Sequence, residues 1–281
     1  RAMVGIERAI KNIKPKIVVV YGDVNTTLAG AISAKKENVY VVHVESGLRS
    51  GDITMPEEQN RIMVDSISDL LFVTEESGIK NLETEGSADR AILVGNTMID
   101  SLRKITDQLD NQERAGYCVA TFHRPSNVDH KESLSRVLEI FEKSSMKIIW
   151  PIHPRAAKSL RKFKMITRAK KISNLEIRNP MGYREFIGLV NNASAVITDS
   201  GGIQEETTFL RIPCITYRDS TERPSTVDVG SNTLTMSIER IVSLIKSVER
   251  GTYKECKIPM NWDGHAGSRI SLIIKRKLLF L

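Results

Sequence analysis

Cysteine, aromatic residues and long apolar runs are all scarce in this 281-residue chain, and each scarcity excludes a class of protein. The three cysteines, Cys118, Cys214 and Cys256, share no metal-ligand spacing, and nothing in them implies an oxidising compartment. No apolar run reaches the length of a transmembrane helix, and the first residues lack the apolar region of a signal peptide. We therefore predict a cytoplasmic protein that does not insert in a membrane.

Aromatic residues make up 5% of the chain, and none of them interleaves with a basic run. The net charge is +7, but the basic residues are scattered, so the sequence does not predict nucleic-acid binding. A positive net charge does suit an anionic ligand. The hydrophobic fraction of 41% and charged fraction of 27% are typical of a globular protein with a sizeable core. The length is enough for two ordinary domains.

The chain begins at Arg1, without an initiator methionine. Residues 1–12 have the pattern of an amphipathic helix, and this helix leads directly into a predicted strand at 17–21. A helix that precedes a buried strand predicts that the first domain lacks its N-terminal βα units.

Strands and helices alternate in two series, which are separated by an apolar-poor stretch at 106–116. A first domain is predicted over 1–105 and a second over 106–265. Strands are predicted at 17–21, 39–44, 71–74, 91–94, 118–122, 147–152, 175–178, 195–198 and 213–217. Helices are predicted at 26–36, 56–70, 76–85, 131–144, 183–191 and 237–249, and from about 156, 203 and 267. Continuous apolar strands between helices indicate parallel sheets covered on both faces. The fold class is α/β, with two Rossmann-like domains and a cleft between them.

The segment Ala195-Val-Ile-Thr-Asp-Ser-Gly-Gly-Ile-Gln-Glu-Glu206 is the most informative stretch of the chain. A strand ends at Thr198, a glycine pair is expected to turn the chain, and a helix is expected to open at Ile203. Backbone N–H groups and the helix dipole at such a turn favour an anion, and glycines let a phosphate approach closely. The predicted clamp for a nucleotide diphosphate uses Ser200, Gly201, Gly202 and Glu206, with Glu206 accepting from ribose hydroxyls. The segment alone is equally compatible with an ordinary βα turn.

Other predicted strands also end in polar residues, and ligands of such sheets sit outside the carboxyl ends of the strands. Asp23 and Glu45 follow two strands of the first series, and Glu57 begins the next helix. Three carboxylates around one crevice would raise the pKa of at least one of them, which suits general acid–base catalysis. The alternatives are an N-cap role for Asp23 and a simple i,i+4 ion pair between Glu57 and Arg61.

In the second series His123-Arg124 and His153-Pro-Arg155 follow two strands. A histidine beside an arginine is suited to a pyrophosphate, since both donate to phosphate oxygens. No pair of histidines has the spacing of a local metal site, so no metal is predicted. Arg223, fixed before Pro224, is a further candidate for the diphosphate or ribose, although its loop is also compatible with a charged surface.

Together these segments resemble the non-hydrolysing UDP-N-acetylglucosamine 2-epimerases. The matching segments are Gly22-Asp23 with Thr26-Thr27, His43-Val-Glu-Ser-Gly-Leu-Arg49, Pro56-Glu-Glu-Gln-Asn-Arg61, Val94-Gly-Asn-Thr-Met-Ile-Asp100, His123-Arg124, Asp199-Ser-Gly-Gly-Ile-Gln-Glu-Glu206, Arg218 to Pro224, and Gly264 with Ser268-Arg269-Ile270. The resemblance covers nearly the whole chain in order. It implies a GT-B-like fold in which the last helix, within 266–281, crosses back to the N-terminal domain, and it implies a homodimer.

The resemblance also implies a reaction, the interconversion of UDP-GlcNAc and UDP-ManNAc without a redox cofactor. The C2 proton is removed, UDP leaves to give 2-acetamidoglucal, and UDP then adds back as a proton reaches the opposite face. By resemblance, the acid–base carboxylates are Asp23, Glu45 and Glu57, and His123 holds the leaving diphosphate. The substrate contacts are Arg61, Phe186, Ser200, Gly201, Gly202, Glu206 and Arg223. Arg124 and His153 resemble positions that bind a second, activating UDP-GlcNAc in some bacterial members.

The chain departs from the family pattern at several places. The family's Gly-Thr-Arg-Pro-Glu loop is missing, and with it an arginine of the diphosphate site. Pro125-Ser126-Asn127 replaces a common Arg-Glu-Asn, which puts the activator contact in question, and Met181 stands at a frequent glutamine. Three alternatives stay open: an epimerase of a related UDP-2-acetamido sugar, a GT-B glycosyltransferase, and a non-catalytic UDP-sugar binder. The polymer that receives the product is not indicated.

Overall fold

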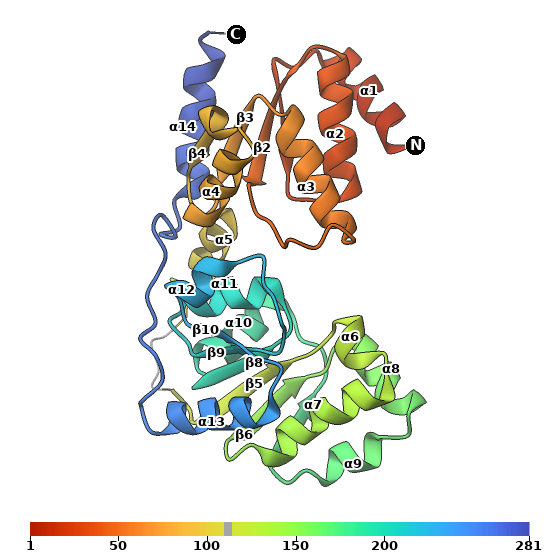
Figure 1. The fold of residues 1–281 in the computed structure, drawn as a ribbon, viewed down its shortest axis with the longest axis vertical. Helices are drawn as coiled ribbons and strands as arrows, with labels where there is room; N and C mark the ends of the chain where they lie inside the picture. Colours follow the sequence, from red (N-terminus) through yellow and green to blue (C-terminus); the bar gives the residue numbers. More distant parts are fainter. Residues whose placement is uncertain (110–113, 281) are drawn as a thin grey trace. The chain divides into compact units, whose positions relative to one another are not determined.

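The computed structural model describes residues 1–109 and 114–280, which form two compact α/β units (Figure 1). Unit 1 comprises Arg1–Ser101 and Pro259–Leu281, and unit 2 comprises Leu102–Ile258. The prediction of two Rossmann-like domains is confirmed, because each unit is built on a parallel sheet. The boundaries predicted at 105/106 and 265/266 stay predictions of where independent domains begin and end.

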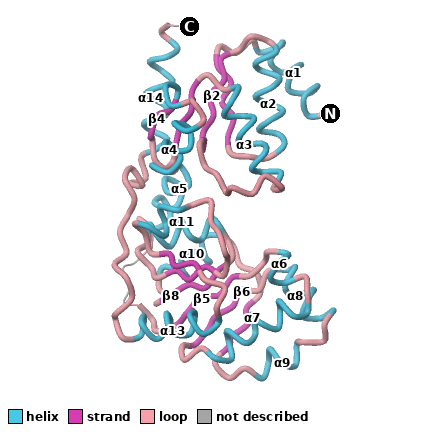
Figure 2. The backbone as a smooth tube through the Cα atoms, viewed as in Figure 1, coloured by secondary structure: helices cyan, strands magenta, loops and turns pink. Residues whose placement is uncertain are grey.

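Unit 1 contains a four-stranded parallel sheet in the order β1-β2-β3-β4. Its strands are β1 (Ile17–Tyr21), β2 (Tyr40–Ser46), β3 (Leu70–Val73) and β4 (Ala91–Leu93). Its helices are α1 (Ala2–Ile13), α2 (Asn25–Lys36), α3 (Pro56–Ile67), α4 (Glu76–Thr84), the 3₁₀ turn η1 (Ala88–Arg90), the start of α5 (Thr97–Thr106) and α14 (Ala266–Leu278). Figure 2 shows these strands in magenta with helices beside them.

Gly30 and Asp100 help to position helices α2 and α14 of unit 1. A Cβ on Gly30 of α2 would lie 3.1 Å from Val20 Cγ1, so α2 packs close against β1. At the other end of the chain, Ile270 of α14 joins an apolar cluster with strand residues of β2 and β3. Asp100 holds the start of α14 by accepting from the backbone N–H groups of Ala266 at 3.0 Å and Gly267 at 2.7 Å. The terminal helix therefore belongs to the sheet of unit 1.

Unit 2 contains a six-stranded parallel sheet in the order β10-β9-β8-β5-β6-β7. Its strands are β5 (Tyr117–Thr121), β6 (Lys147–Pro151), β7 (Leu175–Arg178), β8 (Ala195–Thr198), β9 (Cys214–Thr216) and β10 (Asn232–Leu234). Its helices, after the end of α5, are α6 (Pro125–Val128), α7 (Lys131–Lys143), α8 (Pro154–Lys162), α9 (Ile166–Lys171), α10 (Tyr183–Asn191), α11 (Gly201–Phe209), α12 (Pro224–Asp228) and α13 (Ile238–Glu249).

This strand order is the Rossmann order 3-2-1-4-5-6, with β5 as the first strand. The chain builds one half of the sheet from β5 to β7 and then returns to add β8 on the other side of β5. The carboxyl ends of β5 and β8 therefore form the topological switch point, where ligands of such sheets bind. One apolar cluster of this unit joins β5, β6, β8 and β9 to α7, α8 and α13, and a second cluster includes Val190 of α10.

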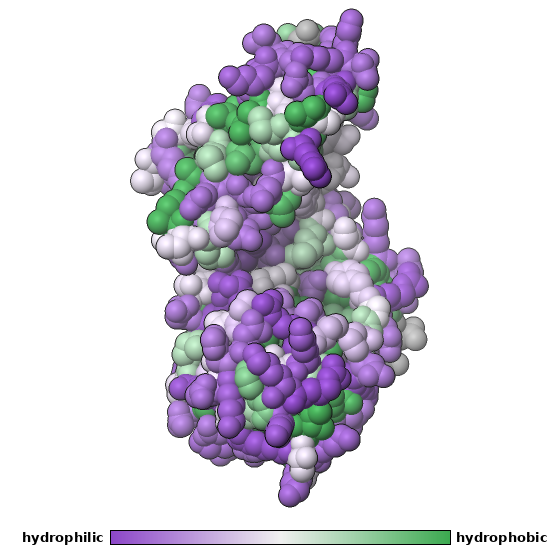
Figure 3. All heavy atoms as spheres, turned by 90° about the vertical axis from the view of Figure 1, so that its right-hand side faces the viewer, coloured by the Kyte–Doolittle hydropathy of each residue, from purple (hydrophilic) through white to green (hydrophobic). Residues whose placement is uncertain are grey.

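The structure adds elements that the sequence pattern did not predict. Helix α5 ends at Thr106, where the linker at 106–116 was predicted to begin, and residues 110–113 of that linker lie outside the described residues. The short helices α6, α9 and α12 and strand β10 are also additions. Within the described part of the chain no helix is both long and apolar enough to span a membrane. Figure 3 shows a mostly hydrophilic face with limited apolar patches on each unit.

Candidate active-site residues in the two units

The switch point of unit 2 is organised by Asp199, which follows β8 and is fully buried. Its carboxylate accepts from the backbone N–H groups of His123 at 3.1 Å and Arg124 at 3.0 Å, which follow β5. Asn127 Nδ2 donates at 3.0 Å, and His123 Nδ1 lies 3.1 Å away. Burial opposes the charge of Asp199, but hydrogen bonds from His123, Asn127 and Arg124 hold the pKa of this carboxyl below its usual range. The carboxylate thus fixes the β5 turn against the β8 turn.

The glycine pair begins helix α11, so the prediction that it forms a turn before a helix from Ile203 is wrong. Ser200 is the N-cap, and its side chain makes no capping hydrogen bond. Its backbone N–H donates to Thr198 Oγ1 at 2.9 Å. A Cβ on Gly201 would meet no atom within 4 Å, which leaves open space over the first turn. These features leave the helix N-terminus able to receive an anion.

Glu206 lies in α11 and is 5% exposed. Tyr183, at the start of α10, donates its hydroxyl to Glu206 Oε1 at 2.8 Å. The other oxygen, Oε2, is buried and has no hydrogen-bond partner among the described residues. Burial raises the pKa of Glu206 to about 7, although the hydrogen bond from Tyr183 opposes the rise. An unpartnered acceptor fits a ligand that brings hydroxyl donors.

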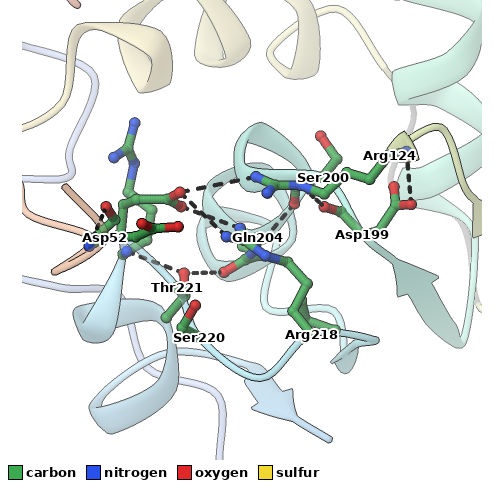
Figure 4. Close-up of polar contacts among 12 residues, drawn as sticks. Asp52, Arg124, Asp199, Ser200, Gln204, Arg218, Ser220 and Thr221 are labelled. Carbon is green, nitrogen blue, oxygen red and sulfur yellow. Dashed lines mark hydrogen bonds and ion pairs between the residues drawn. The ribbon is translucent and has the colours of Figure 1, made fainter. Parts of the chain in front are cut away.

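A buried network holds the loop after β9 beside α11 (Figure 4). Arg218 donates from both Nη atoms to Glu222, at 3.1 and 3.2 Å, and both side chains are almost fully buried. Burial disfavours the Glu222 anion, but the Arg218 guanidinium outweighs it and lowers the pKa of Glu222 to about 2. Thr221 Oγ1 donates to Gln204 Oε1 at 2.7 Å. The loop is therefore pinned at its start and middle.

Arg223 and Arg124 do not extend free into solvent, since each is tied to a residue at the switch point. Arg223 Nε donates to Glu205 Oε1 at 2.7 Å, and its side chain is 12% exposed. Arg124 Nε donates to the Asp199 carbonyl at 2.9 Å, and its Nη2 lies 3.9 Å from Glu222 (Figure 4). Both predicted ligand-binding arginines thus have partners within unit 2.

His123, His153 and Phe186 complete the predicted set in unit 2. The rings of His123 and His153 are 5.5 Å apart between centroids. Burial and the neighbouring His123 lower the pKa of His153. His153 also caps α8 by accepting from the Arg155 backbone N–H at 3.2 Å. Phe186 of α10 is half-buried and packs on the apolar cluster beneath α11.

In unit 1, Asp23 is held by Arg61. Nη2 of Arg61 donates to Asp23 Oδ2 at 2.6 Å, and Nη1 donates to Glu58 Oε2 at 3.0 Å. The i,i+4 pair between Glu57 and Arg61 is therefore a wrong alternative, because the arginine uses Glu58. An N-cap role for Asp23 is also wrong, because the N-cap of α2 is Val24. The side chain of Asp23 is 24% exposed and available to a ligand.

Glu45 sits at an irregularity of β2, where the register against β3 shifts between Val44 and Ser46. Its φ of +70° is in the left-handed region, which a residue with a Cβ rarely adopts. A Cβ on Gly22 would lie 3.9 Å from Glu45 Oε2, so the turn before Asp23 runs beside the Glu45 side chain. Glu57 lies in the first turn of α3 and is exposed. Asp23 and Glu45 are thus neighbours at one edge of the sheet.

Sequence reasoning assigned no role to several side chains that hold the site: the buried residues His43, Asp65, Glu58, Arg218 and Glu222, and the exposed Tyr183. One signal was available for Asp65, which follows Arg61 by four residues and so shares its helix face. Among residues 1–109 and 114–280, no group of three or more His, Cys, Asp or Glu side chains is placed to hold a metal ion.

Comparison with known proteins gives a consistent result. The profile of the UDP-N-acetylglucosamine 2-epimerase family matches residues 1–275. A Methanocaldococcus jannaschii protein named UDP-N-acetylglucosamine 2-epimerase is 41% identical over 295 residues, covering 98% of this chain and 79% of that protein. The crystal structure of M. jannaschii UDP-GlcNAc 2-epimerase in complex with UDP-GlcNAc and UDP matches with a TM-score of 0.81 at 39% identity, over 98% of this chain and 80% of that one. A Pseudomonas aeruginosa UDP-2,3-diacetamido-2,3-dideoxy-D-glucuronate 2-epimerase is 34% identical over 281 residues, 96% of this chain and 78% of that protein.

Proposed function

The chain belongs to the UDP-N-acetylglucosamine 2-epimerase family, and we propose that it interconverts UDP-GlcNAc and UDP-ManNAc. The reaction inverts C2 of the sugar. A base removes the C2 proton, the C2–H electron pair forms the C1=C2 double bond, and the C1–O bond breaks so that UDP leaves with its electron pair. UDP then adds back to C1 of 2-acetamidoglucal while a proton reaches C2 on the opposite face.

The residues of unit 2 are suited to hold UDP during this cycle. The first turn of α11, with Ser200, Gly201 and Gly202, receives the diphosphate, and His123 donates to it. The unpartnered Oε2 of Glu206 accepts from a ribose hydroxyl. Phe186 lies near the uracil, and Arg223 reaches the diphosphate by giving up Glu205. A tight hold on UDP matters because UDP must stay bound between elimination and re-addition.

The residues of unit 1 are suited to move the protons. Asp23 follows β1 and Glu45 lies near the end of the adjacent parallel strand β2, and this adjacency is the observation that carries the proposal. Two positioned carboxylates can serve the two faces of one carbon, one as base and the other as acid. Glu57 is the third acid–base candidate, and Arg61 sets the position of Asp23. No redox cofactor enters the scheme.

The test uses Asp23→Asn and Glu45→Gln in the complete protein. Each substitution should lower kcat by about 10²- to 10⁴-fold, the range over which a positioned acid or base contributes. UDP affinity should change by less than about threefold, because the UDP contacts are proposed in unit 2. Glu76→Gln, an exposed carboxylate in the first turn of α4, is the matched control and should keep wild-type turnover. Wild-type kcat in both site variants would refute the assignment.

A related sugar is the second candidate substrate, and the relative from P. aeruginosa favours it. Both substrates carry an acetamido group on C2, so the same proton chemistry applies. Comparison of kcat/KM for UDP-GlcNAc and UDP-2,3-diacetamido-2,3-dideoxy-D-glucuronate separates the two. We expect the value for UDP-GlcNAc to be higher, and the opposite order would move the assignment to the uronate.

Three finer assignments rest on the family resemblance alone. We propose that the protein works in the cytoplasm as a homodimer, and that a second UDP-GlcNAc activates it through Arg124 and His153. The contacts of Arg124 with Asp199 bear on the last point, because an activator would have to bind around an arginine that is already engaged. The test is to add UDP-GlcNAc to the reverse reaction, the conversion of UDP-ManNAc, and to measure its initial rate. Activation predicts that the rate rises.

A further inference from the structure

A buried histidine–carboxylate pair lies beneath the two turns that carry Asp23 and Glu45. His43, on β2, is completely buried, and Asp65, on α3, is 1% exposed. His43 Nδ1 and Asp65 Oδ1 are 2.6 Å apart, and His43 Nε2 is 2.9 Å from the Gly22 carbonyl oxygen. Neither residue has a role in the reaction proposed above.

The hydrogen-bond partners fix the orientation of the His43 ring. A carbonyl oxygen can only accept, so Nε2 carries a proton toward Gly22. Asp65 also accepts from the Gly47 backbone N–H at 3.0 Å, and Arg49 Nη2 lies 2.8 Å from it. Burial opposes the charge, but His43, Arg49 and Gly47 together lower the pKa of Asp65, which keeps it an acceptor. Both ring nitrogens of His43 therefore face an acceptor, the Asp65 carboxylate on one side and the Gly22 carbonyl on the other.

The pair brackets Glu45. One carboxylate, Asp65, holds the side chain of residue 43 with one oxygen and the backbone of residue 47 with the other. Glu45 lies between them with a φ of +70°, a conformation that is unfavourable unless the surroundings impose it. Because Asp65 fixes the chain two residues before and two residues after Glu45, it can impose this left-handed conformation.

The same pair connects Glu45 to Asp23. His43 Nε2 holds the Gly22 carbonyl, and the Gly22 backbone N–H donates to the Val44 carbonyl at 3.1 Å. The turn before Asp23 is therefore tied on both sides to the segment that carries Glu45. A displacement of Asp65 would therefore shift the backbone that carries both Asp23 and Glu45.

We propose that Asp65 and His43 are positioning residues that hold Asp23 and Glu45 in their relative placement, with Asp65 imposing the left-handed conformation of Glu45. Neither is a catalytic residue, since both are buried under the turns. The kinetic part of this inference rests on the proposed function, whereas its structural part does not.

The test compares Asp65→Asn with a matched control, Asp69→Asn, in the complete protein. An amide at residue 65 places an N–H donor where the carboxylate accepts from other donors, so it breaks part of the clamp. Asp69 is also a carboxylate that pins β2, since it accepts from the Val41 backbone N–H at 2.8 Å and from Lys35 at 2.8 Å, but it is far along the strand from Glu45. Both variants lose one carboxylate that anchors β2, and only one of them should disturb the site.

Two readouts decide the proposal. In Asp65→Asn, amide exchange of Gly47 should accelerate and a crystal structure should show Glu45 out of the left-handed region, with neither change in Asp69→Asn. Turnover of UDP-GlcNAc should fall by about 10- to 100-fold in kcat, with KM within about threefold, because a shift of about 1 Å at the reacting groups costs rate more than binding. His43→Gln, which keeps a donor toward Gly22, should lose less kcat than Asp65→Asn.

The proposal is overturned if Glu45 keeps its left-handed backbone conformation in Asp65→Asn. It is also overturned if Asp65→Asn and Asp69→Asn have equal kcat values while the wild type is active. If the wild type does not turn over UDP-GlcNAc, the proposed function fails. The exchange of Gly47 and the conformation of Glu45 then still decide whether Asp65 is the clamp.

Discussion

At the scale of single residues, Glu206 carries the clearest conflict between stability and ligand binding. Its carboxyl is buried with one unpartnered oxygen, and burial raises its pKa from 4.5 to about 7. A folded-state pKa above the unfolded value means that the folded protein binds more protons between pH 4.5 and 7. Stability therefore falls as the pH rises through that window, by on the order of 3 kcal/mol.

We predict that Glu206→Gln stabilises the ligand-free protein at pH 8, because the neutral amide avoids the cost of a buried charge. The gain should shrink as the pH falls from 7 to below 4.5, where the wild-type carboxyl is neutral in both states. Thermal unfolding of both proteins across this pH range measures it. Equal melting temperatures at pH 8 would show that the carboxyl is not strained by burial.

The same substitution should weaken UDP binding. The ionised carboxylate is the better acceptor for ribose hydroxyls, so wild-type affinity should drop about tenfold between pH 8 and pH 6 as the carboxyl is protonated. Titration calorimetry with UDP should show weaker binding and a flatter pH dependence for Glu206→Gln, with phosphate protonation common to both proteins. An unchanged affinity would remove Glu206 from the ribose contact.

Sequence spacing identified Glu206 and Asp23 but not their partners. The i,i+4 rule pairs Arg61 with Glu57, whereas the folded chain gives it Glu58 and Asp23, which is 38 residues away. Tyr183 reaches Glu206 from a different helix in the same way. Such partners depend on how elements pack, and a single sequence does not contain that information in local form.

At the scale of elements, the loop after β9 depends on the buried pair Arg218–Glu222. We predict that Glu222→Gln destabilises unit 2 by about 3–5 kcal/mol, since it leaves a buried guanidinium without its counter-charge. Removing both partners in Arg218→Met/Glu222→Met should cost less than the sum of the single changes. Urea unfolding with a probe in unit 2 measures the free energy of unfolding of the single and double variants. Strictly additive losses of this free energy would contradict a coupled pair.

The direction of the Glu222 pKa shift determines how the stability supplied by this pair depends on pH. The pKa of Glu222 is lowered from 4.5 to about 2, so its contribution is complete above pH 4.5 and is lost as the pH falls through about 2. The stability difference between wild type and Glu222→Gln should therefore narrow on acidification. A constant difference would indicate that the charge of Glu222 is not responsible.

A second element, the turn before α5, requires glycine. Gly95 has a φ of +88°, and a Cβ there would lie 2.0 Å from the Asn261 carbonyl oxygen. We predict that Gly95→Ala destabilises unit 1 by more than about 2 kcal/mol through steric overlap in addition to backbone strain. Gly86→Ala is the control, because its φ is +71° but its Cβ would meet open space, and it should cost about 1 kcal/mol. Equal costs would show that Asn261 moves aside freely.

Several elements were predicted at their observed bounds, because their apolar runs or their helical period are clear. β1, β7, β8 and α10 occur at the residues that the pattern indicates. The short pieces α6, α9, α12 and β10 were not predicted, because so few residues do not complete a period. The glycines at 201 and 202 suggested a turn, but helical N-termini accept glycine, so α11 begins two residues early.

At the scale of the whole molecule, the alternation of strands and helices predicted two parallel α/β units, and the structure confirms them. The strand order of unit 2 did not follow from that alternation. Only the structure places β8 beside β5 and thereby brings Asp199 to His123. The family resemblance supplied the functional roles, and the fold supplies the reason that these residues meet.

The central claim is that this chain inverts C2 of a UDP-sugar by proton exchange. The most direct measurement is proton NMR of the complete protein with UDP-GlcNAc in D2O. We expect new UDP-ManNAc signals, with deuterium at C2 of both sugars as equilibrium is approached. UDP-GlcNAc that binds, as line broadening would show, but keeps its C2 proton and gives no second sugar would contradict the account.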